Sequence, residues 1–217
     1  STPNTIYFSG TGDIDSFSST GSGSILLEDK IVGLKSFRNE LFIFCQNSIF
    51  KLININDSST VAVVPVTKNV GCIDGQTIQE IAGDLIFLAP DGFRTVAGTA
   101  RIGDVELGTI SQAIQPIIND IVAAKSTLQF SSVVIRDKSQ YRMFYSTSTD
   151  TAATSKGIIG TLRPNGFEWS ETLGIQAPAI ASGFDNNGEE KFYHGDRDGY
   201  VYNHNVGNTF NPAGVET

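Results

Sequence analysis

The chain has 217 residues, of which 40% are apolar, enough to bury the core of one large or two small domains. Its 15 basic and 23 acidic residues give a net charge of −8, the wrong sign for gripping nucleic acid by its phosphates. Apolar runs such as Leu41–Cys45 are far shorter than the roughly 20 residues of a membrane-spanning helix, and no export signal is visible. The composition therefore predicts a folded, soluble protein.

Short runs rich in Val, Ile, Phe and Tyr alternate with turn residues, and the chain contains 22 glycines and 14 phenylalanines. This pattern predicts an all-β protein, and the lack of strand–helix alternation argues against a parallel α/β sheet. The predicted strands are Thr5–Ser9, Ile31–Phe37, Leu41–Gln46, Ile49–Ile55, Val61–Thr67, Ile78–Ala82, Leu85–Ala89, Arg94–Ala97, Ser132–Arg136, Tyr141–Ser146, Gly157–Leu162, Phe167–Ser170, Ile180–Phe184, Lys191–Tyr193 and Tyr200–Asn203.

One segment, Thr109–Ile121, has isoleucines at helical spacing and predicts a short helical insertion. Thr109 and Gln112 have the spacing of a capping box, which favours a helix start at this point. Pro116 should break or kink the segment, so two short turns and one bent helix are equal expectations. Because nothing on it is reactive, we expect a helix that packs against a sheet.

A recurring form consists of an acidic or amide residue, an apolar strand, a polar turn and a second apolar strand. Its copies are NELFIFCQNSIFKLINI, GDLIFLAPDGFRTVAG, the less regular KSQYRMFYSTSTD, and EEKFYHGDRDGYVYNHN. The turn residues Asn47, Asp91 and Asp198 are separated by 44 (91 − 47) and 107 (198 − 91) positions, the second being about two intervals of 50. A period near 45 to 50 residues with about four strands favours β-propeller blades over a sandwich.

At this period, residues 1–217 form a single propeller domain of about four or more blades. A closed ring would then need strands from elsewhere in a longer chain. The start at Ser1, without an initiator methionine, leads us to expect a fragment or processed form of a longer protein.

The cysteines and histidines carry no metal-binding pattern. Cys45 and Cys72 lie on or beside apolar runs, so we expect buried free thiols, with a single disulfide as the alternative. His194 and His204 lie near a turn among tyrosines and asparagines, and we expect them at the surface or at a strand edge.

Acidic residues gather in predicted turns, where Asp, Asn and Gly are favoured by backbone geometry. The groups are Asp13 with Asp15, Asp185 to Glu190, and Asp196 with Asp198. None supplies the ligand ladder of a calcium loop, so turn formation is the preferred interpretation. We predict no metal and no cofactor.

No enzyme motif of the G-x-S-x-G, H-E-x-x-H or P-loop kind occurs, and Gly10–Gly12 and Gly21–Gly23 lack the strand and helix of a phosphate site. A single tryptophan, Trp169, is poor provision for stacking on sugars. The prediction is a protein that is not an enzyme and has no catalytic residues; channel-lining and interface residues cannot be assigned from the sequence.

Four segments follow one another along the chain: PNTIYFSGTGDIDSF, GLKSFRNELFIFCQNSIFKL, VTKNVGCIDGQTIQEIAGDLIFLAPDGFRTVAG and ISQAIQPIINDI. Their order resembles that in the tail nozzle and tail-hub proteins of short-tailed bacteriophages. The similarity covers roughly Pro3 to Tyr145. Its most specific part is Val70–Gly98, followed by the Ser-x-x-Ile-x-Pro pattern of Ser111–Pro116.

The resemblance implies a structural virion component whose propeller hangs on a tail-tube platform. It implies a homo-oligomeric ring, with a hexamer suspected, at the distal DNA-exit channel of a tail assembled in the host cytoplasm. Adjacent tail adaptor and fibre proteins would be partners, and genomic DNA would pass without specific binding. The alternatives are a carbohydrate-binding or glycan-cleaving propeller for host-surface contact, and a cellular scaffold propeller that binds peptides.

Overall fold

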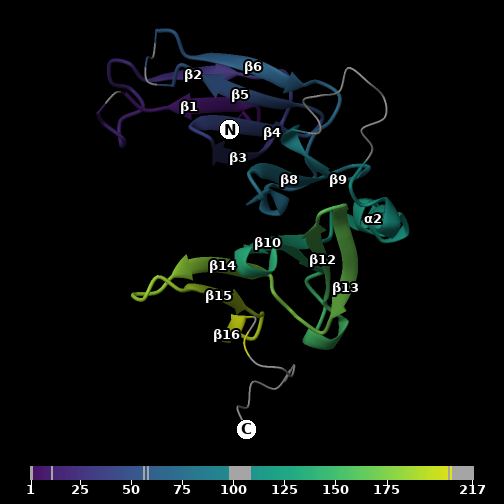
Figure 1. Cartoon of the computed structure of the whole chain (residues 1–217). Coiled ribbons are helices and arrows are strands. Elements are labelled where there is room, and N and C mark those ends of the chain that lie inside the picture. The colour runs from purple at the N-terminus through teal and green to yellow at the C-terminus, as the bar shows by residue number, and fades with distance from the viewer. Residues whose placement is uncertain are drawn as a thin grey trace.

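A computed structural model describes residues 2–10, 12–55, 57, 59–97, 109–204 and 206 (Figure 1). Over these residues the protein is all-β, as predicted, with five small antiparallel sheets. The first is the ribbon of β1 (Thr5–Phe8) and β2 (Gly23–Leu26). The second contains β3 (Ile31–Phe37), β4 (Glu40–Cys45), β5 (Ile49–Ile53) and β6 (Ala62–Thr67), and the third contains β7 (Gln79–Ile81), β8 (Asp84–Ala89) and β9 (Gly92–Thr95).

The fourth sheet contains β10 (Gln129–Ile135), β11 (Gln140–Ser146), β12 (Lys156–Arg163) and β13 (Gly166–Leu173), and the fifth contains β14 (Ala179–Phe184), β15 (Glu190–Gly195) and β16 (Val201–His204). Helix α2 (Gln115–Ala124) and the 3-10 turns η1 (Gly75–Thr77), η2 (Gln112–Ile114), η3 (Arg136–Lys138) and η4 (Ala152–Thr154) lie between strands. No helix in the described ranges is both long and apolar enough to cross a membrane.

Every sheet is a meander in which each strand pairs with its successor in the chain. The last four sheets begin at residues 31, 79, 129 and 179, at intervals of 48 (79 − 31), 50 (129 − 79) and 50 (179 − 129). Asn47, Asp91 and Asp198 all lie in the turn between the second and third strands of their sheets. The less regular copy is β11 with β12, whose connection is the longer segment 147–155. The predicted repeat is therefore a repeat of sheets.

Successive sheets pack face to face, with a separate apolar cluster between each pair. Ile6 and Leu27 of the ribbon region cover Ile43, Phe50 and Leu52 of the second sheet. Strand β8 is buried on both faces, because Leu85, Phe87 and Ala89 face the second sheet while Ile86 and Leu88 face the fourth. This explains why its sequence, DLIFLA, is an apolar run without alternation.

Two residues from neighbouring sheets show how closely these faces meet. The rings of Phe44 and Phe87 are both fully buried and pack edge to face, with centroids 5.2 Å apart. Farther along the stack, Val133 and Ile135 of β10 pack against Phe192 of β15.

Polar contacts join the same sheets. The Tyr141 hydroxyl donates to the Thr77 carbonyl at 2.9 Å, and the Gln79 side-chain amide donates to the Ser132 carbonyl at 2.9 Å, which link the third and fourth sheets. The Ser131 hydroxyl donates to the Ala177 carbonyl, and Arg136 pairs with Glu190, which link the fourth and fifth. The third, fourth and fifth sheets are therefore joined by polar contacts as well as by apolar packing.

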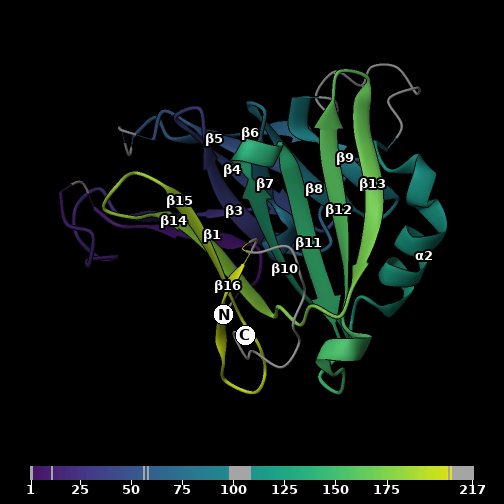
Figure 2. The ribbon, with the colours of Figure 1, turned by 60° about the horizontal axis from the view of Figure 1, so that its bottom comes forward.

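Helix α2 lies beside β9 and the outer part of the fourth sheet (Figures 1 and 2). Ile114, Ile118 and Ile121 point into the cluster shared by the third and fourth sheets, so the predicted packing helix is confirmed. The predicted capping box is wrong, because the 3-10 turn starts only at Gln112 and no side chain caps either helix start. Pro116 lies in the first turn of α2, where a backbone N–H has no helical partner, so it does not break the helix.

Several strand boundaries in the structure differ from the predicted ones. Strand β2 was not predicted, because its sequence, GSIL, follows a run of Gly, Ser and Thr typical of a loop. The predicted strand Arg94–Ala97 is shifted, since β9 spans Gly92–Thr95 and Val96 lies beyond its end. Strand β15 extends past the predicted Lys191–Tyr193 on both sides, because pairing with β14 and β16 sustains it.

Replacing Phe44 by Ala should lower the free energy of unfolding by about 3 to 5 kcal/mol, because it leaves a cavity between two sheets. Leu34→Ala is the control: Leu34 is 51% exposed, so the expected loss is under about 1 kcal/mol. Urea unfolding followed by circular dichroism measures both. Equal losses would contradict the packing described above.

Candidate functional site

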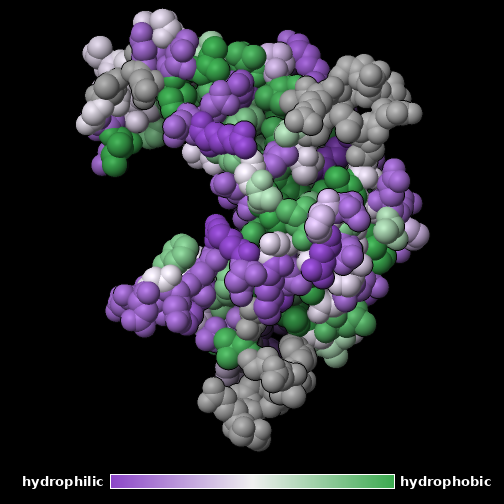
Figure 3. All heavy atoms as spheres, viewed as in Figure 1, coloured by the Kyte–Doolittle hydropathy of each residue, from purple (hydrophilic) through white to green (hydrophobic). Residues whose placement is uncertain are grey.

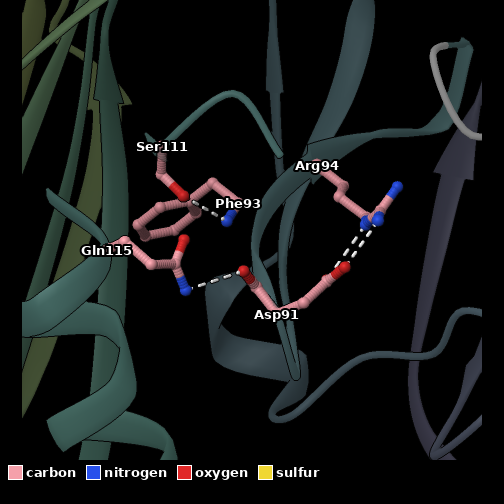
Figure 4. Close-up of polar contacts among 5 residues, drawn as sticks. All are labelled: Asp91, Phe93, Arg94, Ser111 and Gln115. Carbon is pink, nitrogen blue, oxygen red and sulfur yellow. Dashed lines mark hydrogen bonds and ion pairs between the residues drawn. The ribbon is translucent and has the colours of Figure 1, made fainter. Parts of the chain in front are cut away.

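The Asp91–Gly92 turn between β8 and β9 meets the segment that leads into α2 (Figure 4). The backbone N–H of Phe93 donates to the buried Ser111 hydroxyl oxygen at 2.9 Å. The N–H of Ile110 donates to the Phe93 carbonyl at 2.9 Å. Residues 110 and 111 therefore satisfy the backbone groups of Phe93 on the side of β9 that faces away from β8.

Two side chains hold the turn itself. Arg94 makes a two-pronged contact with the Asp91 carboxylate, with Nε 3.0 Å from Oδ1, and this contact raises the pKa of Arg94. The Gln115 side-chain amide donates to the Asp91 carbonyl at 3.1 Å (Figure 4). It also donates to Asn119 Oδ1 at 3.0 Å. The first residue of α2 is thus tied to the hairpin.

We call the contact of the Asp91–Gly92 turn with residues 110, 111 and 115 the Asp91 joint. Trp169 of β13 completes it. Its ring stacks on Phe93 with centroids 4.7 Å apart and an interplanar angle of 12°, and Phe167 stacks beside it at 5.4 Å. The indole N–H donates to the Ile110 carbonyl at 2.7 Å. Gly160 lies opposite Trp169 on β12, where a Cβ would approach the ring to 2.6 Å. Trp169 is therefore used in packing, which leaves its Phe93-facing side closed to a sugar.

The joint contains no activated group. The Asp91 carboxylate is neutralised by Arg94, and the Ser111 hydroxyl is buried where it accepts a backbone hydrogen bond. Nucleophilic catalysis would require a base in contact with the Ser111 oxygen, and none contacts it within the described residues. What this arrangement does is position the third sheet, α2 and the fourth sheet relative to one another.

Replacing Gly92 by Ala should destabilise the protein by at least about 2 kcal/mol. Its φ is +141°, and a Cβ would lie 2.6 Å from Ser111 Oγ and 2.8 Å from Thr109 Cβ. Gly188→Ala is a matched control with φ of +78° and nothing within 4 Å of the added Cβ, so only the backbone term of about 1 kcal/mol remains. The comparison uses chemical unfolding, and a Gly92 loss no larger than the Gly188 loss would refute this role.

His194 and His204 form the second polar cluster, between the fourth and fifth sheets. His204 is only 4% exposed, so it does not lie at the surface, but it ends β16, the outer strand of the described fifth sheet, as the strand-edge alternative predicted; His194 is half-buried in β15. Their Nδ1 atoms are 3.2 Å apart, and His204 Nε2 is 3.1 Å from Arg142 Nη1. Nothing in the sequence indicated the contact between His204 and Arg142, because Arg142 precedes His204 by 62 positions.

The contacts determine where the protons reside. Arg142 can only donate, so His204 Nε2 must accept, and His204 carries its proton on Nδ1. That proton is donated to His194 Nδ1, which must accept in turn. Both rings are therefore neutral. Burial is the main cause that lowers the pKa of both histidines. The pKa of His204 falls to about 4, and the positive charge of Arg142 contributes to this shift.

This histidine pair should make stability fall as pH decreases from about 6.5 to about 4. The unfolded chain takes up a proton near pH 6.5, whereas folded His204 resists protonation until about pH 4, so unfolding is favoured across that window. The expected loss is of the order of 2 to 3 kcal/mol. His204→Gln, which keeps a donor and an acceptor, should flatten the slope in urea titrations between pH 7 and 4.5. An unchanged slope would exclude this assignment.

The remaining predicted residues have structural roles. Asp185 Oδ1 accepts from the N–H groups of Asn187 and Glu189, and Asp196 Oδ1 accepts from those of Asp198 and Tyr200, all at 2.9 Å. Asp13 Oδ1 accepts from the N–H of Asp15 at 3.3 Å, so turn formation is confirmed in each acidic group. Within the described residues, no group of three or more His, Cys, Asp or Glu side chains is arranged to hold a metal.

Cys45 and Cys72 are buried free thiols, as predicted. Burial raises the pKa of Cys45 to about 11 and that of Cys72 to about 12. Both therefore stay protonated at neutral pH, which makes them poor nucleophiles.

Comparison with known proteins adds no family: no protein-family model matches the chain, and no curated protein matches it.

Proposed function

We propose that the chain is a β-propeller domain with a structural role in the tail nozzle or hub of a short-tailed bacteriophage. The observation that carries the propeller is the series of four-stranded and three-stranded meanders that begin every 48 to 50 residues and stack face to face. Sheets stacked in this way bury both faces, as blades around an axis do.

The first strands of the sheets support a central channel. Strand β10 contacts both β7 and β14, and β3 contacts η1, so the first strands follow one another along the inside of the stack. The surface is hollowed on one side, and mostly hydrophilic side chains surround the hollow (Figure 3). In the proposed assembly this hollow belongs to the channel wall, and the surplus of acid, a net charge of −8, disfavours retention of DNA.

Both ends of the described stack present an uncovered sheet face. Tyr7 and Leu26 on the ribbon are 60% and 71% exposed, and Tyr193 and Val201 on the last sheet are 47% and 73% exposed. A complete propeller would cover these faces with further blades. The tail role, the hexameric ring and contacts with adaptor and fibre proteins rest on the resemblance of the four segments between Pro3 and Ile121.

The carbohydrate-binding or glycan-cleaving alternative gains nothing from the structure. Its main residue, Trp169, stacks on Phe93 and bonds to Ile110, so loss of glycan binding in Trp169→Ala would report a disturbed joint as readily as a lost subsite.

The proposal predicts a homo-oligomer whose mass is a multiple of 23.3 kDa, measured by light scattering after size-exclusion chromatography. Negative-stain electron microscopy should show rings with a central channel, and mass spectrometry of purified virions should detect the chain as a stoichiometric component. A ring needs heterologous contacts that close on themselves. A monomer at tens of micromolar, together with absence from virions, would overturn the proposed function.

A further inference from the structure

A cleft of about 240 Å³ lies between α2 and the β11–β13 part of the fourth sheet. One wall is apolar and comes from Ile117, Ile121 and Ala124 of α2, with Leu128 just after the helix. The other wall comes from the sheet, where Tyr145 pairs with Lys156 and Ile158 pairs with Glu171. The cleft is separate from the Asp91 joint and from the histidine pair.

Tyr145 is the buried polar group of this cleft. The residue is only 8% exposed, yet its hydroxyl makes no hydrogen bond within the described part of the chain. Because Tyr145 lines the cleft, a ligand bound there can supply the hydrogen-bond partner that the described chain does not. Glu171 and Asp120 line the same cleft, and burial together with their charges raises the pKa of Tyr145 to about 12.

The charged groups at the rim are unevenly balanced. Asp120 and Glu171 form no ion pair within the described residues, and Asp150 is fixed by the Thr147 N–H at 2.6 Å and the Thr154 hydroxyl at 3.1 Å. Lys156 is the cation of the lining, and it is exposed and also without an ion pair there. Three carboxylates against one ammonium leave the cleft negative.

From this arrangement we propose that the cleft binds a primary ammonium group carried on a short apolar stem. The ammonium donates to the Tyr145 oxygen and to the Glu171 and Asp120 carboxylates, while the stem lies on Ile117 and Ile121. An ammonium has three donors and no acceptor, which suits a lining that offers a phenol oxygen and two carboxylates. The same chemistry is offered by a free alkylamine and by the lysine side chain of a partner protein.

The test is a titration of the folded chain with n-butylammonium, which reproduces a lysine side chain from Cβ outward, followed by amide chemical shifts. Shifts should concentrate on α2, β11 and β13, with a millimolar dissociation constant, whereas n-butanol and butyrate should bind at least about tenfold more weakly. Equal binding of butanol, or shifts elsewhere, would overturn the proposal.

Variants separate the roles of the lining residues. Asp120→Asn combined with Glu171→Gln should weaken binding about tenfold, and Tyr145→Phe about threefold. Lys156→Met should strengthen it about threefold, because it removes the competing cation. Glu168→Gln on the same strand as Glu171 is the control for the loss of one carboxylate; Glu168 pairs with Arg163 and does not line the cleft, so binding should not change. No strengthening in Lys156→Met, or an effect of Glu168→Gln as large as that of the double variant, would count against the site.

A second titration distinguishes the sources. Lysine capped as its N-acetyl methylamide binding at least as tightly as n-butylammonium would point to a partner protein, because the backbone is then tolerated at the mouth. Exclusion of the capped residue with retention of n-butylammonium would point to a free amine. Failure of both overturns the ammonium site and leaves the proposed tail role untouched, since neither depends on the other.

Discussion

The face-to-face packing of successive sheets is the contact on which the rest of the structure depends. Small sheets of three or four strands cannot bury enough surface alone, and each here becomes stable by covering its neighbour. Strand β8 shows this most clearly, because its side chains serve two clusters at once. Phe44 and Phe87 meet in one of those clusters, where each full burial contributes about 1.5 to 3 kcal/mol.

The third sheet has three strands in the described residues, and the side of β9 that faces away from β8 is bonded to the segment that leads into α2. Residues 110 and 111 bond to the backbone of Phe93, α2 covers the adjoining apolar face, and Trp169 reaches across from the fourth sheet. The segment from Ile110 to Gln115 thus ties the third sheet to the fourth, and the Asp91 hairpin is its anchor.

The fourth sheet has polar groups on two sides, towards the fifth sheet and towards α2. Towards the fifth sheet, Arg142 and the two histidines form a neutral buried chain of hydrogen bonds, which couples this contact to protonation. On the side of α2, Tyr145 and its carboxylates leave a negative cleft open. The first belongs to the internal joint, whereas the second is accessible to another molecule.

The sequence by itself determined the all-β class, the approximate repeat, the buried thiols and the turn role of the acidic groups, because each follows from local composition and spacing. The sequence did not predict strand β2, the end of β9 or the start of the helical segment at Gln112, because partners distant in the chain determine them. Only the tertiary structure brought His204 to Arg142, Trp169 to Phe93 and Glu171 to Tyr145. The residues of these three pairs are separated by 62 (204 − 142), 76 (169 − 93) and 26 (171 − 145) positions. Pairing across such separations depends on how sheets stack, and a pattern of neighbouring residues does not encode it.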